Sequence, residues 1–193
     1  MSKWTLKEVI VMAALSVVFG VIYLAFIPIG GILVGFMGPI GYEPIFGIWF
    51  IVSIIAAYIF QKPGAAFISE TIAATIEVML GNALGPLIIV VGIIQGIGAE
   101  AVFAATRWKN YSLWVLMLAG MGSAVTSFIW GMFQNGYIAF APSYILAMFV
   151  IRLISGALIG GWLGKVISDA LAKTGVLASF ALGKQYKKRK KAA

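Results

Sequence analysis

Long apolar stretches separated by short connections are the feature that most restricts how this chain can fold. A transmembrane helix needs about 20 mainly apolar residues, and stretches of about that length recur along the whole chain. Backbone groups in lipid must be satisfied within the spanning structure, which leaves α-helices or closed β-barrels. The stretches here are continuous and lack the apolar–polar alternation of barrel strands. The sequence therefore predicts an all-α, polytopic membrane bundle.

About six transmembrane helices are expected, within a single integral membrane domain over 1–193. Composition agrees, because 62% of the residues are hydrophobic and 10% are charged, against about 25% charged in a typical soluble protein. The first apolar stretch runs to Ile27 and meets Pro28 without a small-residue cleavage site, so no cleavable signal peptide is predicted. The expected spans are 9–27, 45–60, 65–80, 87–105, 113–133 and 144–167, followed by a basic tail over 170–193.

Positive charge is confined to one side of this six-span arrangement. The connections 28–44, 81–86 and 134–143 contain no Lys or Arg. An excess of Lys and Arg in short connections marks the cytoplasmic side, so both termini are expected in the cytoplasm, with the chain in the plasma membrane. The formal net charge of +8 is then explained by topology and lipid contact rather than by nucleic acid. The cations on the predicted inner side are Lys3, Lys7, Lys62, Arg107, Lys109 and the basic tail.

The chain has no Cys and no His, which narrows its chemistry. Thiol chemistry, Cys/His metal sites, His-ligated haem and His-dependent catalytic pairs are excluded. The segment Gly160 to Val166 resembles a phosphate-binding loop only superficially, since it lacks the spacer and the Ser/Thr after the Lys. No enzyme activity, cofactor or metal is predicted.

The first outer connection, residues 28–44, is apolar and rich in Gly and Pro. A connection with no function is usually polar, so this one is expected to be a re-entrant or capping segment over the bundle mouth, acting as a lid. The alternative is a plain amphipathic connector.

Ionisable groups within a bilayer are costly and point to function by default. Glu77 lies in the outer half of the third span and is expected to contact a ligand. Glu70 and Glu100 lie toward the inner side, where a structural role is expected, with an inner-side cation neutralising each. Arg152 is expected to be a counter-ion for one of the buried glutamates.

Aromatic and amide side chains gather at the same outer level as Glu77. Aromatic faces stack on heteroaromatic rings and attract cations, and amides and carboxylates bind ring nitrogens and amino groups. The alternative is the interfacial aromatic belt, which needs no ligand. Tyr23, Phe46 and Tyr137 belong to this level as well. The predicted binding residues are Glu77, Trp49, Gln95, Trp130, Gln134, Tyr42, Glu43, Asn82, Asn135 and Tyr144.

Two segments carry a family resemblance that extends over nearly the whole chain. These are Trp4-Thr-Leu-Lys-Glu-Val-Ile10 and Gly38-Pro-Ile-Gly-Tyr-Glu-Pro44. Together with six short spans and inner termini, they resemble the substrate-binding S components of energy-coupling-factor (ECF) transporters. Within that group they look like the YkoE-type members, which are associated with thiamine or its hydroxymethylpyrimidine precursor.

The resemblance implies a mechanism and partners. An S component captures a vitamin from outside and topples in the membrane. It releases the vitamin inward when docked on a transmembrane coupling protein driven by two ATPase subunits. A carboxylate on the third helix engages the aminopyrimidine in related thiamine binders, and Glu77 occupies the matching place. The family's Ala-x-x-x-Ala docking motif is not intact, since Ala13 and Ala14 are followed by Val17 and Val18; Ser16 and Gly20 offer a substitute small pair.

Two other functions remain open on the sequence alone. One is an intramembrane enzyme acting on lipid, which would need a carboxylate pair or a Ser/Lys pair. The other is an assembly protein of the membrane with no transport role. Polar groups that converge from several spans favour ligand capture over assembly.

Overall fold

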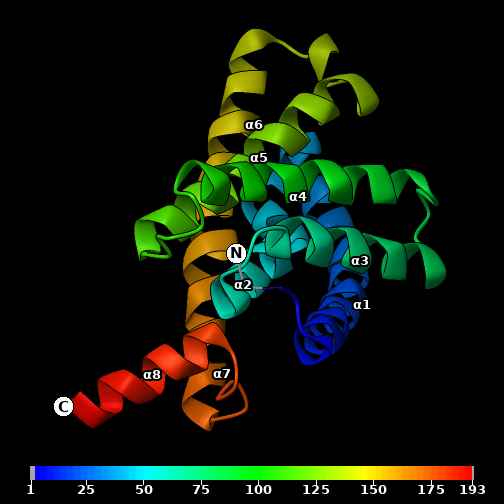
Figure 1. The fold of residues 1–193 in the computed structure, drawn as a ribbon. Helices are drawn as coiled ribbons and strands as arrows, with labels where there is room; N and C mark the ends of the chain where they lie inside the picture. The colour runs from blue at the N-terminus through cyan, green and yellow to red at the C-terminus, as the bar shows by residue number, and fades with distance from the viewer. Residues whose placement is uncertain (1–2, 193) are drawn as a thin grey trace.

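The computed structural model describes residues 3–192, and all regular secondary structure in this range is helical (Figure 1). Two of the segments, η1 and η2, are 3-10 helices, and η3 is a π-helix. In chain order the elements are α1 (Leu6–Met37), η1 (Pro39–Phe50), α2 (Ile51–Phe60), α3 (Ala65–Met79), α4 (Leu87–Ala105), α5 (Leu113–Gln134), η2 (Tyr137–Ala139), α6 (Pro142–Ser155), η3 (Gly156–Leu163), α7 (Gly164–Thr174) and α8 (Ala181–Ala192).

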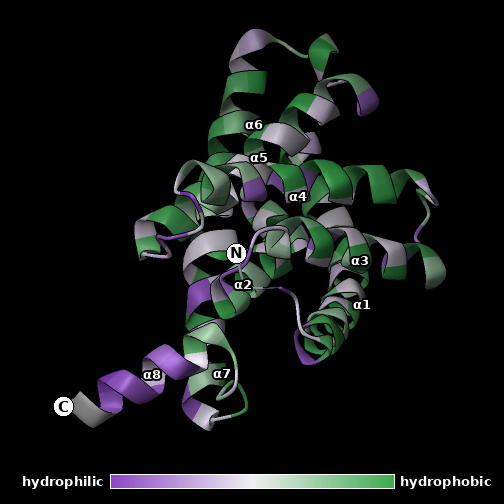
Figure 2. Cartoon of the chain, in the orientation of Figure 1, coloured by the Kyte–Doolittle hydropathy of each residue, from purple (hydrophilic) through white to green (hydrophobic). Residues whose placement is uncertain are grey.

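The predicted polytopic bundle is confirmed, and the count of six is approximate. Within the described residues, five continuous helical stretches are long and apolar enough to cross a membrane: α1, η1–α2, α4, α5 and α6–η3–α7. The remaining predicted span is α3, whose 15 residues fall short of the roughly 20 needed. Apolar residues dominate the bundle helices, whereas α8 is strongly hydrophilic (Figure 2).

The first connection is not a loop, which corrects the expectation for residues 28–44. Helix α1 continues through Pro28 to Met37, and the chain turns at Gly38, whose φ is 72°. The Gly38 amide donates to the Val34 carbonyl at 2.8 Å, and η1 starts at Pro39. An apolar segment at membrane depth cannot leave its backbone polar groups unpaired. The segment therefore forms helical backbone hydrogen bonds, although its Gly and Pro residues would favour a loop in water.

Helix α2 is the centre of the bundle, and all ten of its residues are buried. Close approach of other helices around it depends on glycine. A Cβ at Gly120 in α5 would collide with the Gly156 carbonyl of η3, and a Cβ at Gly20 in α1 would lie 2.8 Å from the Ala73 carbonyl of α3. Small residues at such crossings let membrane helices pack by direct backbone contact.

The small residues Ser16 and Gly20 therefore contribute to helix packing within the molecule. Both residues are buried, and Gly20 packs on α3. This corrects the suggestion that the pair substitutes for the family's docking motif. The outward face of α1 instead presents apolar side chains such as Val17, Val18 and Val21.

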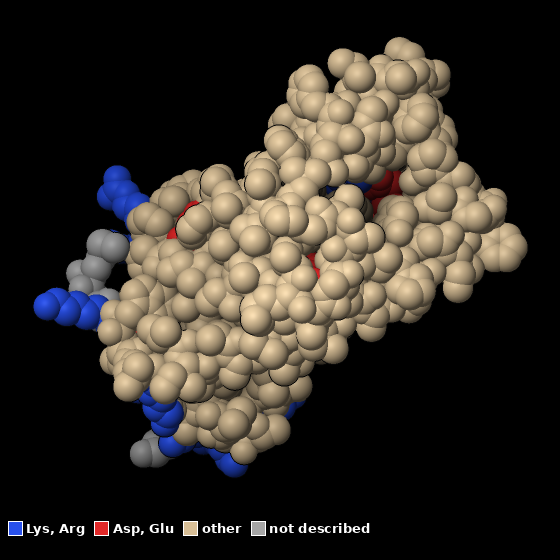
Figure 3. All heavy atoms as spheres, turned by 90° about the vertical axis from the view of Figure 1, so that its right-hand side faces the viewer, with Lys and Arg blue, Asp and Glu red and all other residues tan. Residues whose placement is uncertain are grey.

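The two ends of the bundle differ in charge. The turns at 61–64, 106–112 and 175–180 lie at the end that also carries α8, and Lys and Arg side chains gather on that part of the surface (Figure 3). At this end Lys62 pairs with Glu8 at 2.6 Å. The turns at 80–86 and 134–141 lie at the other end, together with the turn at Gly38. We call these the basic end and the cavity end.

Candidate ligand-binding cavity

A cavity of about 490 Å³ opens at the cavity end, between α1, η1, α3, α4 and the end of α5. Small-molecule sites typically have volumes of about 300–1,000 Å³, so this space suits a vitamin-sized ligand. The cavity is lined by Ile27, Val34, Pro39, Tyr42, Phe46, Trp49, Ala74, Glu77, Asn82, Ala83, Leu84, Ile88, Val91, Gly92, Gln95, Gln134, Asn135 and Tyr137.

The carboxylate of Glu77 is the only charged group among these lining residues. Glu77 is 3% exposed, and one of its oxygens accepts a hydrogen bond from Asn82 Nδ2 at 2.9 Å. Asn82 is held in turn, because its Oδ1 accepts from the Leu84 amide at 2.9 Å. The turn after α3 therefore fixes one carboxylate oxygen of Glu77 and leaves the other for a ligand.

Two amide side chains face the same space from α4 and α5. Gln95 is 3% exposed, and within residues 3–192 its side-chain amide makes no hydrogen bond, so it can both donate and accept. Gln134 accepts at Oε1 from Trp130 Nε1 at 2.9 Å, which leaves its NH₂ group available. Both amides can therefore form hydrogen bonds with a polar ligand in the cavity.

One wall of the cavity is aromatic. Trp49 lies 5.6 Å from Tyr42 and 5.8 Å from Phe46, measured between ring centroids. Its indole N–H donates to the Tyr23 carbonyl at 3.1 Å, which anchors the ring to α1. The Tyr42 hydroxyl donates to the Ile27 carbonyl at 3.4 Å. These rings form a fixed surface on which a flat heteroaromatic ligand can stack.

Most of the residues singled out in the sequence meet at this cavity. Seven of the ten line it, namely Glu77, Trp49, Gln95, Gln134, Tyr42, Asn82 and Asn135. Trp130 lies behind Gln134 as its hydrogen-bond donor. Tyr144 accepts the Ile40 amide at 3.0 Å and braces the start of η1. Glu43 is fully buried in an ion pair with Arg152 and does not line the cavity.

The other membrane ionisable groups differ partly from expectation. Arg152 is a counter-ion to a buried glutamate, as expected, and its partner is Glu43. Glu70 pairs with no cation among residues 3–192; it accepts from Ser53 Oγ at 2.7 Å and Tyr23 Oη at 3.3 Å. Within the described part of the chain Glu100 binds no cation either, and its carboxylate caps the start of α3. Both roles are structural, but polar donors, not cations, satisfy these two carboxylates.

Part of the cavity lining was not predictable from the sequence. Phe46 and Tyr137 were expected at the outer level of the bundle but were not among the predicted binding residues. The sequence does not indicate which aromatic residues at a membrane interface face inward. Ile88, Val91 and Gly92 of α4 gave no signal, because an apolar residue facing a cavity looks like one facing lipid. Gly92 packs against Ala74 of α3, and this crossing forms part of the cavity wall.

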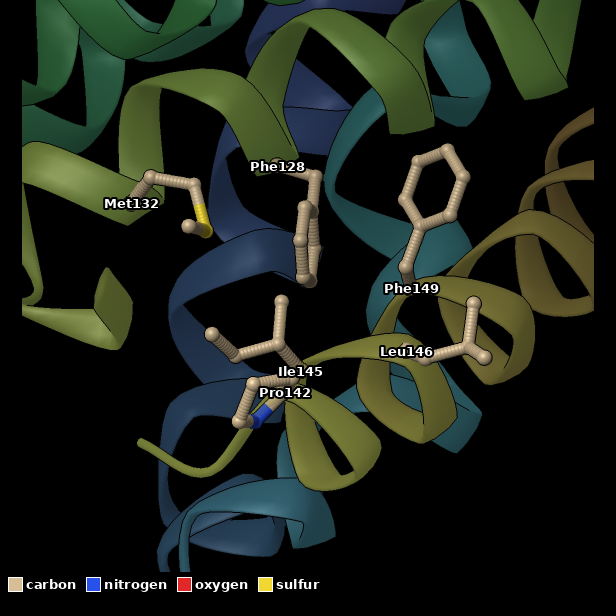
Figure 4. A pocket seen from close by; sticks show the side chains of 6 residues that line it. All are labelled: Phe128, Met132, Pro142, Ile145, Leu146 and Phe149. Atoms are coloured by element: carbon tan, nitrogen blue, oxygen red, sulfur yellow. The ribbon is translucent and has the colours of Figure 1, made fainter. Parts of the chain in front are cut away.

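A second hollow, of about 380 Å³, lies between α5 and α6 (Figure 4). Its lining is entirely apolar: Phe128, Met132, Pro142, Ile145, Leu146 and Phe149. Leu146 is 62% exposed, which places this hollow on the outer face of the bundle. It offers no polar group to orient a ligand, and we do not assign it a binding role.

The protein is a helical membrane bundle with a polar and aromatic cavity at one end. This arrangement is typical of membrane proteins that capture a small molecule from one side. A model of the family "ABC-type cobalt transport system, permease component" matches residues 7–126. The chain is 62% identical over all of its 193 residues to the "Putative HMP/thiamine permease protein YkoE" of Bacillus subtilis (strain 168), covering 97% of that protein.

A solved structure gives the same result. The fold matches the "Crystal structure of an S-component of ECF transporter" with a TM-score of 0.96 and 62% identity, over 98% of this chain and 96% of that one. The chain belongs to the YkoE-like S components of ECF transporters, which are transporter subunits and not enzymes.

Proposed function

We propose that this S component captures thiamine or its hydroxymethylpyrimidine (HMP) precursor in the cavity described above. It delivers the ligand inward when coupled to an ECF transmembrane protein and two ATPase subunits. The relative's name supplies the ligand class. The observation that carries the proposal is the lone carboxylate of Glu77 in the same cavity as the aromatic wall of Tyr42 and Trp49. An aminopyrimidine can donate to that carboxylate while its ring stacks on that wall.

The proposed orientation follows from charge. The basic end faces the cytoplasm together with both termini, and the cavity end faces outward. The chain acts as one integral membrane domain. Val34, Pro39 and Tyr42, all within the 28–44 segment, line the cavity. Their position supports a role for this segment in covering the bound ligand.

The cavity chemistry also predicts discrimination against phosphate esters. Among the described residues that line it there is no Lys or Arg. At the start of α4, the Ile88 and Ile89 amides already donate to the carbonyls of Gly85 and Pro86 at 3.1 Å. A phosphate would lie beside Glu77 without a counter-charge.

We expect purified protein to bind thiamine and HMP, and to bind thiamine monophosphate at least about tenfold more weakly than thiamine. Isothermal titration in detergent with the three ligands measures this. Protein that binds none of them contradicts the proposed function, whereas equal affinity for the phosphate ester contradicts only the charge argument.

Fluorescence separates the two tryptophans that were candidates for stacking. Trp49 lines the cavity and Trp130 does not, so ligand should quench Trp49 directly. We expect Trp49→Phe to lose most of the ligand-dependent quenching, while Trp130→Phe keeps it. A Trp49→Phe variant that quenches like the parent would show that the ligand stacks elsewhere.

A further inference from the structure

The ion pair between Glu43 of η1 and Arg152 of α6 lies directly behind the cavity wall. The side chains are 0% and 1% exposed. Arg152 Nε donates to one carboxylate oxygen at 2.5 Å, and one of its terminal nitrogens donates to the other at 2.7 Å. A guanidinium cannot deprotonate in a protein, so its charge is balanced only while Glu43 is ionised. Burying such a pair costs desolvation free energy and is weak evidence for a stabilising role.

Arg152 also contacts two side chains that line the cavity. Its guanidinium carbon lies 3.6 Å from the ring centroid of Phe46, and the same terminal nitrogen that binds Glu43 donates to the Tyr137 hydroxyl at 3.3 Å. The Tyr137 hydroxyl additionally accepts from Asn135 Nδ2 at 3.1 Å. Phe46, Tyr137 and Asn135 all line the cavity. The guanidinium thus joins η1 to the η2 turn through ligand-facing groups.

We infer that Glu43 and Arg152 form a specificity-determining pair: Arg152 positions Phe46 and Tyr137, and Glu43 cancels the Arg152 charge so that Glu77 alone sets the charge of the cavity. This inference rests on the proposed function, since it concerns preference among ligands of that cavity. Without Glu43, a permanent cation would stand behind Phe46 and oppose a cationic ligand. A neutral ligand of similar shape would be much less affected.

The test compares thiamine, whose thiazolium is a permanent cation, with HMP, which is neutral at pH 7.5. The measured quantity is the ratio of the two affinities. Glu43→Gln should lower the thiamine-to-HMP ratio about five- to tenfold, as expected for an unbalanced charge behind the cavity wall. Arg152→Gln should not lower it. The double variant Glu43→Gln/Arg152→Gln should return the ratio to within about twofold of wild type.

General damage to the fold cannot produce this pattern, because it would reduce both affinities together. The matched control is Glu8→Gln, which breaks the Lys62 ion pair at the basic end and should leave the ratio unchanged. An unchanged ratio in Glu43→Gln overturns the inference alone. Failure of wild type to bind either ligand overturns the proposed function and this inference with it.

A milder pair of variants tests the positioning role if Glu43→Gln does not fold. Tyr137→Phe removes only the hydroxyl that Arg152 binds. Arg152→Lys keeps the positive charge but loses the bidentate hydrogen-bonding geometry of the guanidinium. If Arg152 acts through Tyr137, each variant should weaken binding of both ligands about three- to tenfold, and the combination should lose little more than either alone. Fully additive losses, or no loss, would overturn the positioning role.

Discussion

Replacing Glu77 with Gln should weaken thiamine binding about tenfold or more while the protein stays folded in detergent. Glu77 is 3% exposed and carries the only charge among the cavity-lining residues. A hydrogen bond to a charged partner contributes roughly 1.5–3 kcal/mol, which corresponds to about ten- to a hundredfold in affinity. Gln keeps the size of the side chain and can still accept from Asn82, so the loss should fall on the ligand rather than on the turn.

The comparison with a partly buried carboxylate, that of Glu100, makes this result specific. Glu100→Gln alters a carboxylate at the opposite end of the bundle, at the start of α3, and should leave affinity unchanged within about twofold. Titration calorimetry gives the affinities, and the melting temperature confirms folding. Wild-type affinity in Glu77→Gln would remove Glu77 from the site and leave the aromatic wall as the main recognition element.

Charge segregation and apolar length made most of the fold predictable. The boundaries 87–105 and 113–133 agree closely with α4 and α5, because polar residues follow each span and Gly/Pro or Ser precedes it. Residues 28–44 were wrongly predicted to form a loop, because their Gly and Pro residues indicate a loop in water but not in lipid, where unpaired backbone groups are too costly. Helix α1 therefore continues ten residues past the expected end at Ile27.

The candidate binding residues were predictable only as a level within the membrane. Polar groups such as Glu77, Gln95 and Gln134 are costly to bury, so their presence on three spans indicated a shared site. The sequence did not predict which side chains each ionisable group would pair with. Glu43 was grouped with the ligand residues, yet the fold brings it against Arg152, 109 positions away. That pairing depends on how η1 packs on α6.

Glu100→Ala should lower the free energy of unfolding by roughly 3 kcal/mol, which would be among the largest single-residue effects at the basic end. The Glu100 carboxylate accepts from the backbone amides of Gly64, Ala66 and Phe67 at 2.6, 3.1 and 3.3 Å. It also accepts from Trp108 Nε1 at 2.7 Å. The first amides of a helix have no partner within it and favour a negative charge, so one carboxylate from α4 serves as the cap of α3.

This capping role differs from the expectation for Glu100, whose sequence position suggested an ion pair with an inner-side cation. The only Arg in the adjacent turn, Arg107, is exposed, and Arg107→Gln should change stability by no more than about 0.5 kcal/mol. Glu100→Gln keeps an accepting oxygen, so its loss in the free energy of unfolding should lie between those of Glu100→Ala and Arg107→Gln. Unfolding in mixed detergent, followed by circular dichroism, ranks the three variants. If Arg107→Gln destabilised the protein as much as Glu100→Ala, an ion pair rather than helix capping would hold α3 to α4, and the short third helix would depend on charge pairing across the turn.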